Sequence, residues 1–168
     1  MVRTSLSDIL ALPDPFLPYN FDLVVANVPG GGNSRSLTTK CMSTSIPGVT
    51  IEPALVQLHG AEAQFAGRII WSHNLSVTYL ETRDISTRQT LTGWFFYARD
   101  IRNNTGSYKA QYATLAQLLL YDDVGNVTRT IQLENCFPLT LEDAAISGNE
   151  STPVNLTGTL SYDFFQDV

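Results

Sequence analysis

The sequence predicts a mainly β fold, a β-sandwich or open barrel of about six antiparallel strands with one α-helix on its flank. Residues 69–80 and 153–165 alternate strictly between apolar and small polar side chains, which is typical of half-buried strands. Residues 82–101 instead place apolar side chains three and four apart, which is typical of a helix. Thr, Ser and Asn supply 18, 13 and 10 of the 168 residues, a composition that favours strands and turns.

The first third of the chain is read as an arm, a hairpin and a loop. The arm, residues 1–18, holds a possible helical turn over 5–12 that prolines end. A strand over 19–28 stops at the turn signal PGGGN, and residues 34–43 are predicted to be its hairpin partner. Residues 43–68, STSIPGVTIEPALVQLHGAEAQFAGR, carry only three charges and no clear period. They are predicted to form an extended loop, and structureless loops of that length are usually functional.

The remaining elements follow from periodicity and turn residues. In the strand 69–80, the side chains of Ile69, Trp71, His73, Leu75, Val77 and Tyr79 share one face. The helix 82–101 is expected to start at Thr82 or Asp84 and to bury Leu91, Trp94, Phe95 and Ala98. Strands over 108–121 and 127–137 are joined by the turn DDVGN, Pro138 ends the second, and 153–165 forms the last strand.

Size and charge exclude several classes of protein. A chain of 168 residues is one domain by the usual size prior, here residues 1–168. Its net charge of −6 argues against tight nucleic-acid binding, which needs Lys and Arg to neutralise phosphates. No apolar run approaches the ~18 residues of a membrane span, and the N-terminus is too short and acidic for a signal peptide. Cys41 and Cys136 are therefore expected to be free and buried, with a disulfide as the less favoured alternative.

No catalytic, cofactor-binding or metal-binding residues are predicted. Gly30–Gly32 is placed between two strands, so it lacks the helix N-terminus that a phosphate-binding loop needs. His59 and His73 have no Cys or acid at ligand spacing, and His73 is expected to be a satisfied core or interface residue. Asp122 and Asp123 are interpreted as turn formers rather than a carboxylate pair.

The order of these parts resembles the tail tube proteins of contractile-tailed bacteriophages, and more distantly the tube proteins of type VI secretion and related injection systems. The segments that carry the resemblance are PYNFDLVV, STSIPGVTIEP, WSHNLSVTYLETRD, TLTGWFFYARD and, at the end, ENCFPLTLED with NESTPVNLTGTLSYDFF. The resemblance covers nearly the whole chain from about residue 14 and lies in order and spacing rather than in one invariant motif.

The resemblance implies a structural virion protein with no catalysis. Hexameric rings would join their sheets into a continuous inner barrel, with the helix outside, and would stack into a tail tube assembled in the bacterial host cytoplasm. The implied partners are other copies of the chain, the tail sheath, the baseplate or tube initiator, the tape measure and the tail terminator. Phage DNA would pass through the lumen without specific binding, and no membrane anchor is expected.

Three sets of residues receive roles on this basis. The set expected to face the lumen is Ser72, Asn74, Ser76, Thr78, Thr130, Gln132, Glu134, Asn155, Thr157, Thr159 and Asp163. The set expected to contact a neighbouring subunit, because it is apolar and nearly uncharged, is Ile46, Pro47, Val49, Ile51, Pro53, Leu55, Val56 and Leu58. Arg88, Arg99 and Arg102 are expected to face the sheath, and a merely solvated helix face is the alternative for them.

Two other functions stay open from the sequence. The chain could be the tube subunit of a contractile injection or secretion particle, because ring chemistry is shared with phage tails. It could also be a monomeric β-sandwich binding module, although such a module needs an exposed aromatic platform on a loop. An enzyme has no supporting constellation of residues.

Overall fold

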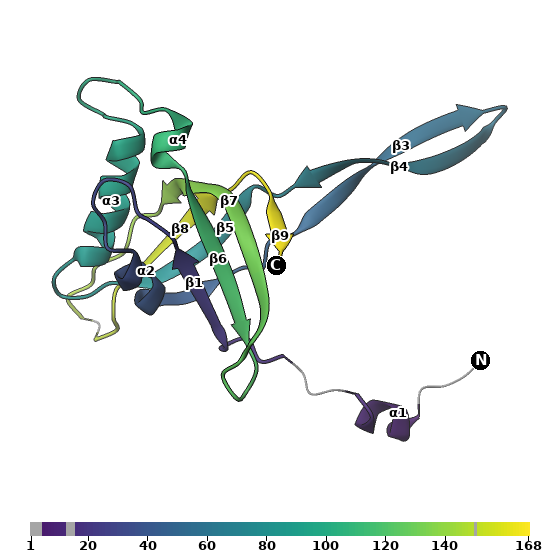
Figure 1. The fold of residues 1–168 in the computed structure, drawn as a ribbon, viewed down its shortest axis with the longest axis horizontal. Coiled ribbons are helices and arrows are strands. Elements are labelled where there is room, and N and C mark those ends of the chain that lie inside the picture. Colours follow the sequence, from purple (N-terminus) through teal and green to yellow (C-terminus); the bar gives the residue numbers. More distant parts are fainter. Residues whose placement is uncertain (1–4, 13–15, 150) are drawn as a thin grey trace.

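The protein is built around one antiparallel seven-stranded sheet from which a separate two-stranded hairpin projects (Figure 1). The computed structural model describes residues 5–12, 16–149 and 151–168. In the large sheet the strand order is β1-β6-β7-β8-β5-β2, with β9 beside β7. The strands of the large sheet are β1 Phe21–Val25, β2 Cys41–Thr44, β5 Asn74–Leu80, β6 Thr114–Tyr121, β7 Val127–Leu141, β8 Asn155–Ser161 and β9 Phe165–Asp167; those of the hairpin are β3 Val49–Leu58 and β4 Ala61–Trp71.

The large sheet curls around the core. Its two end strands, β1 and β2, come into contact with each other, which fits the open-barrel alternative of the expected fold. Buried Leu75, Val77 and Tyr79 from β5 meet Leu156 and Leu160 from β8 on the inner side of the curl. The prediction of a mainly β protein with antiparallel strands is confirmed, although the described residues form nine strands where about six were expected.

The helices α2 Ser34–Lys40, α3 Ser86–Ala98 and α4 Lys109–Tyr112 lie on one side of the core (Figure 1). The short helix α1 Leu6–Leu10 lies in the arm, away from the core. The helix α3 buries Thr87, Leu91 and Trp94, and the Trp94 indole donates a hydrogen bond of 2.7 Å to the carbonyl of Tyr112. Leu91 and Trp94 of the expected apolar stripe are buried, whereas Phe95 and Ala98 are only half-buried. The helix is shorter than 82–101 and begins after Ile85 rather than at Thr82 or Asp84.

The predicted hairpin of residues 19–28 and 34–43 is wrong. Residues 34–40 form the helix α2, whose N-terminus is capped by the Asn33 side chain, which accepts a hydrogen bond from Ser36 N. The strand β1 pairs with β6, and the short strand β2 pairs with β5. Leu37 is buried in the core, and this tertiary contact favours the helix. The local sequence pattern does not reveal the contact, so the helix was not predicted.

Residues 43–68 are not an extended loop. The strands β3 and β4 pair along almost their whole length and leave the body on the side away from α3 (Figure 1). They meet at a two-residue turn, His59 and Gly60, whose φ angles of 50° and 80° are those of the mirror-image turn that suits a twisted hairpin. The segment escaped prediction because the register shifts between Ile51 and Pro53, which interrupts the alternation.

Four of the predicted strands also differ from expectation. The stretch 69–80 breaks at Ser72 and His73, where β4 leaves the hairpin and β5 joins the large sheet. The stretch 153–165 breaks after Ser161, and β9 continues beside β7. Pro138 does not end its strand, because β7 runs on to Leu141 with a register shift after Pro138. Residues 108–113 hold α4 rather than strand.

Candidate assembly surfaces

One face of the large sheet is lined by hydroxyl and amide side chains. On β5, Asn74, Ser76 and Thr78 alternate with buried residues, and β8 opposes Thr159 to Ser76 and Thr157 to Thr78. Directly opposed residues of an antiparallel pair share a face, so these side chains form one surface turned away from the core. The register thus brings together the β5 and β8 residues of the predicted lumen set. Asn155, the first residue of β8, is one of them.

The same character continues onto β7 and β6. Thr130, Gln132 and Glu134 alternate with buried Ile131 and Leu133, and Gln132 donates a hydrogen bond of 2.6 Å from its amide to the Glu134 carboxylate. Two polar residues that the sequence analysis did not select lie on this face, Gln117 opposite Gln132 and Thr140 opposite Thr159. The alternation of β6, where Ala116 and Leu118 are buried, turns Gln117 away from the core, but only its pairing with Gln132 shows that it joins this face.

Two further members of the predicted lumen set, Asp163 and Ser72, are also engaged in contacts within the subunit. Asp163 lies between β8 and β9 and accepts hydrogen bonds from Lys109 Nζ at 2.6 Å and from Asn135 Nδ2 at 2.7 Å. These contacts hold the pKa of the Asp163 carboxyl below its usual value, with the Lys109 hydrogen bond as the largest cause. Ser72 Oγ and the Tyr162 hydroxyl share a hydrogen bond of 2.5 Å.

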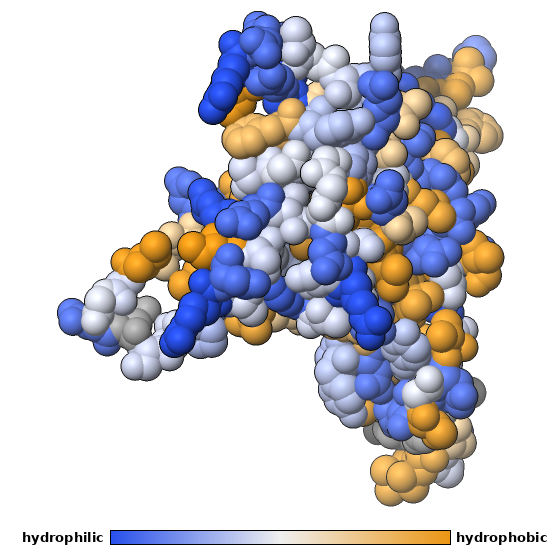
Figure 2. Space-filling model, turned by 60° about the vertical axis from the view of Figure 1, so that its left-hand side comes forward, coloured by the Kyte–Doolittle hydropathy of each residue, from blue (hydrophilic) through white to orange (hydrophobic). Residues whose placement is uncertain are grey.

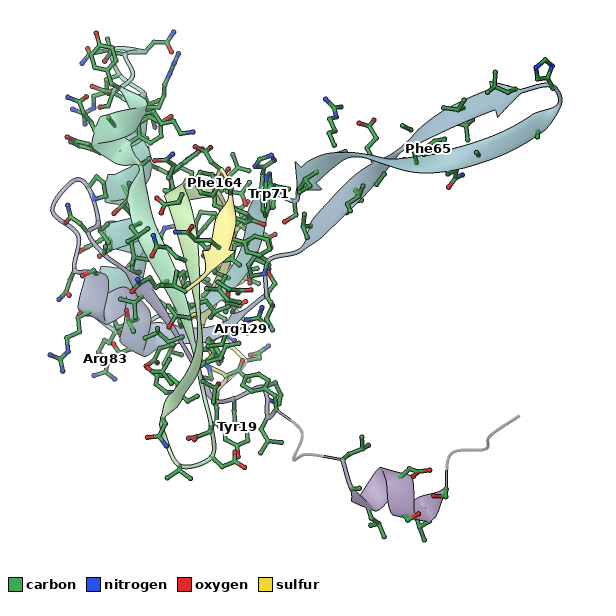
Figure 3. All side chains as sticks on the ribbon, turned by 45° about the vertical axis from the view of Figure 1, so that its right-hand side comes forward. Tyr19, Phe65, Trp71, Arg83, Arg129 and Phe164 are labelled. Atoms are coloured by element: carbon green, nitrogen blue, oxygen red, sulfur yellow. The ribbon has the colours of Figure 1, made fainter. Side chains whose placement is uncertain are left out.

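The hairpin β3–β4 is exposed along its full length. Every residue of β3 is exposed, and so are those of β4 before Trp71. The predicted contact residues Val49, Ile51, Pro53, Leu55, Val56 and Leu58 all lie on β3, and Ile46 is exposed just before it. Pro47 is buried inside the subunit, so it presents no contact surface. Figure 3 shows Phe65, 59% exposed, in the projecting part, whereas Trp71 lies where the hairpin joins the body.

The helical side of the molecule is polar. Figure 2 looks onto this side and shows hydrophilic side chains predominating over its centre. Arg88 is exposed on α3, but Arg99 and Arg102 follow the end of that helix rather than lying on it. Arg99 donates a hydrogen bond of 2.8 Å to Asn104, which tethers it to the loop.

A groove of about 660 Å³ opens between the start of α3 and the segment that leads into β8. Ile85 and Ile146 give it exposed apolar walls, and Arg83 and Asp143 stand among its lining residues. Among the described residues that line the groove, none is a histidine or a cysteine.

The remaining titratable candidates have structural roles. Asp122 accepts hydrogen bonds from the backbone of Val124 and Asn126, which confirms it as a turn former. His73 is exposed rather than in the core, and its Nδ1 lies 2.9 Å from the Tyr162 carbonyl. Among the described residues no group of His, Cys, Asp or Glu could hold a metal ion. Across the same residues, no helix is both long and apolar enough to cross a membrane.

The cysteines and the glycine run correct two details. Both cysteines are free, but only Cys136 is fully buried, whereas Cys41 is half-buried. Burial raises the pKa of each thiol to about 12, which keeps it protonated and unreactive. Gly30–Gly32 joins a strand to the helix α2 rather than two strands, but α2 has only seven residues and Asn33 caps it.

Several solved structures share this fold. A chain of the sheath–tube complex of an extracellular contractile injection system, PVC, superposes with a TM-score of 0.66 at 16% identity, covering 99% of both chains. A chain of the sheath/tube terminator of that system gives 0.70 at 17% identity, covering 94% of this chain and 99% of that one. Hcp1 from Flavobacterium johnsoniae gives 0.51 at 9% identity over 89% and 94%. At these identities the likeness concerns the fold.

The sequence itself supplies the family. Among curated proteins, none matches this chain. The sequence profile described as phage tail tube protein matches residues 17–167, which is nearly the whole chain and includes the sheet, the hairpin and α3. The chain therefore belongs to the phage tail tube protein family.

Proposed function

We propose that this chain forms homohexameric rings that stack into the hollow inner tube of a contractile phage tail, through which DNA is ejected into the host. The proposal is supported by the match of residues 17–167 to the tail tube family. The curled sheet agrees with it, because hydroxyl side chains line the face turned away from the core. Its role is structural rather than catalytic, in keeping with the family.

The polar sheet face is suited to lining a channel for DNA. Small hydroxyl side chains such as Ser76, Thr157 and Thr159 leave the bore wide and provide no cations for phosphate. The carboxylate of Glu134 adds negative charge beside them. Phosphate repulsion from such a wall, screened beyond roughly 8 Å at physiological salt, lowers friction during passage.

The hairpin supplies contacts between subunits. Its apolar residues are solvent-exposed, and its β-strands project from the body, so a neighbouring copy is needed to cover them. Arg88 on the helical side is positioned to meet the sheath, whereas Arg99 and Arg102 would do so from the loop after α3. The baseplate or initiator, tape measure and terminator would contact the ends or the lumen of the finished tube.

Negative-stain electron microscopy of the purified chain tests this proposal. We expect rings with a central hole, or stacked tubes, and sedimentation at the mass of six copies or a multiple of it. A chain that remains monomeric at high concentration would instead support an isolated binding module.

A tube without DNA is the second candidate. The superpositions on the PVC sheath–tube complex and terminator favour it, because both belong to an extracellular contractile injection system. Mass spectrometry and nucleic-acid staining of purified particles separate the two: DNA and capsid proteins accompany a phage tail, and neither accompanies an injection particle.

A further inference from the structure

The hairpin β3–β4 changes its apolar face halfway along its length. Near the body, Val49 opposes Trp71 and Ile51 opposes Ile69, so these four residues share one face. Trp71 packs against Phe165 of the body, so the exposed part of this face, here called the base face, consists of Val49, Ile51 and Ile69. Near the turn, the opposed pairs are Ala54–Phe65, Val56–Ala63 and Leu58–Ala61. These six residues form the tip face, which contains no polar side chain.

Alternation along β3 shows that the two faces lie on opposite sides of the ribbon. The base face holds odd-numbered residues of β3, Val49 and Ile51, whereas the tip face holds even-numbered ones, Ala54, Val56 and Leu58. The β3 strand has no extra residue between them, so its side chains keep strict alternation. An apolar surface on one side near the body therefore gives way to an apolar surface on the other side near the turn.

Two polar contacts confirm this assignment. Behind the base face, Arg68 Nε donates to Glu52 Oε2 at 2.5 Å. Behind the tip face, Gln57 Nε2 donates to Glu62 Oε2 at 3.2 Å. Glu52 and Gln57 are an odd number of residues apart on β3, so the two polar pairs also lie on opposite sides of the ribbon. Each apolar face is thus backed by a mixed side, on which Ile70 accompanies the first polar pair and Leu55 accompanies the second.

A β-bulge in β4 makes the change possible. One residue lies between Ile51 and Pro53 on β3, but two lie between Ala66 and Ile69 on β4. Without the extra residue, Phe65, Ala63 and Ala61 would fall on the side opposite to Ala54, Val56 and Leu58. Gly67 permits the bulge, because a Cβ at that position would lie 2.4 Å from the carbonyl oxygen of Glu52.

We propose that the hairpin docks onto other copies of this chain through the base face near the body and through the tip face at its end. The contact therefore changes sides of the ribbon at the bulge. This inference rests on the proposed tube assembly and adds to it which residues of the hairpin are covered and which stay in water.

A second copy is the occupant that fits these faces. A two-stranded hairpin of this kind is marginally stable alone in water, so its apolar residues need a partner surface in the working state. The tip face has no charge that would select an oppositely charged partner. The helix α3 lies on the side proposed to meet the sheath, and the hairpin leaves the body on the opposite side (Figure 1). At roughly 30 Å for its ten residues, β3 is long enough to cross a neighbouring subunit.

Matched pairs of adjacent residues test the proposal. At the base, Ile69→Lys changes the base face and Ile70→Lys changes the opposite side. Near the turn, Ala63→Lys changes the tip face and Gln64→Lys changes the opposite side. All four variants add one positive charge at exposed positions, so long-range electrostatics is the same for each member of a pair.

Sedimentation velocity over a concentration series, with electron microscopy of the products, measures assembly. We expect Ile69→Lys and Ala63→Lys to raise the midpoint concentration for assembly at least about tenfold, since they bury an unpaired ammonium. Ile70→Lys and Gln64→Lys should stay within about threefold of the wild type. Thermal unfolding should show an intact body in all four variants, because the hairpin lies outside the core.

The outcomes separate this inference from the proposed function. If the wild type assembles and both members of a pair behave alike, the face assignment is wrong while tube formation stands. If Ile70→Lys and Gln64→Lys are the damaging variants, the covered faces are reversed and the inference fails. If the wild type stays monomeric at every concentration, a second copy is not the occupant and both proposals fail.

Discussion

The indole of Trp71 packs edge-on against the ring of Phe165, with centroids 5.0 Å apart and ring planes at 79°. This contact joins the last residue of β4 to the first residue of β9. Phe165 also lies 6.3 Å from the ring of the buried residue Tyr162 and packs against the core. A row of aromatic rings therefore anchors the root of the projecting hairpin on the body, while the rest of the hairpin has no such support.

Replacing Trp71 with Ala should loosen the hairpin. An edge-to-face aromatic pair contributes about 0.5–1.5 kcal/mol beyond area burial, and a double-mutant cycle with Phe165→Leu should recover a coupling in that range. Trypsin should then cleave the purified variant faster after Arg68. Phe65→Ala, far from the anchor, serves as the control and should leave the cleavage rate unchanged; equal acceleration in both variants would contradict the anchoring role.

Glu81 caps α3 from the end of β5, because Ile85 at the N-cap position provides no side-chain hydrogen bond. Its carboxylate accepts from Thr87 N at 3.2 Å and from Arg88 N at 2.8 Å. Glu81→Ala should lower the free energy of unfolding by about 0.5–2 kcal/mol, the range for loss of a helix cap. Urea denaturation measures this, with Gln89→Ala on the exposed side of α3 as a control near zero.

Two glycine substitutions should change stability in opposite directions. A Cβ at Gly158 would lie 2.6 Å from the Thr140 carbonyl oxygen, so Gly158→Ala must displace the β7–β8 pairing and destabilise the protein. A Cβ at Gly93 in α3 meets nothing within 4 Å, so Gly93→Ala should stabilise the helix by about 0.5–1 kcal/mol. Differential scanning calorimetry on both variants checks the pair; a higher melting temperature for Gly158→Ala would contradict the close approach.

The contact of Asp163 with Lys109 should make stability depend on acid pH. Because the pKa of Asp163 is lowered in the folded protein, its contribution is present above the ordinary carboxyl pKa of about 3.9 and is lost as pH falls through the lower folded value. Both side chains are more than a third exposed, so the effect is small. Urea midpoints measured between pH 7 and pH 2 should fall less steeply for Asp163→Asn than for the wild type. Lys109→Met should flatten the curve too, and an unchanged slope in both would exclude this ion pair as a cause.

The elements that could be predicted are those in which burial repeats at the period of the local structure. Leu75, Val77 and Tyr79 are buried as their alternation in the sequence indicated, and Leu91 and Trp94 are buried as their helical spacing indicated. The Asp122 turn was also predicted correctly, since its hydrogen bonds are local. In each case the residues that decide the conformation lie within a few positions of one another.

What failed depends on contacts that are distant in sequence or on irregular backbone. Residues 34–40 form a helix because Leu37 reaches the core, and β1 pairs with a strand almost a hundred residues later. Residues with a left-handed backbone conformation interrupt strands that the local periodicity predicts to be continuous. Examples are His73 between β4 and β5 and Asn135 within β7. The sequence predicted most residues of the polar sheet face. Strand register was needed to show that Gln117 and Thr140 also lie on it.

The sequence by itself therefore determined a mainly β chain, its long helix, its apolar segment 43–68 with few charges, and the resemblance to tail tube proteins. Only the tertiary structure decided that this segment is a projecting hairpin, because a bulge at Gly67 and a turn at His59 hide its alternation. Strand pairing sets register through hydrogen bonds between distant residues, and register decides which side chains share a face. That is why the character of the segment could be predicted, whereas the two apolar faces it presents could not.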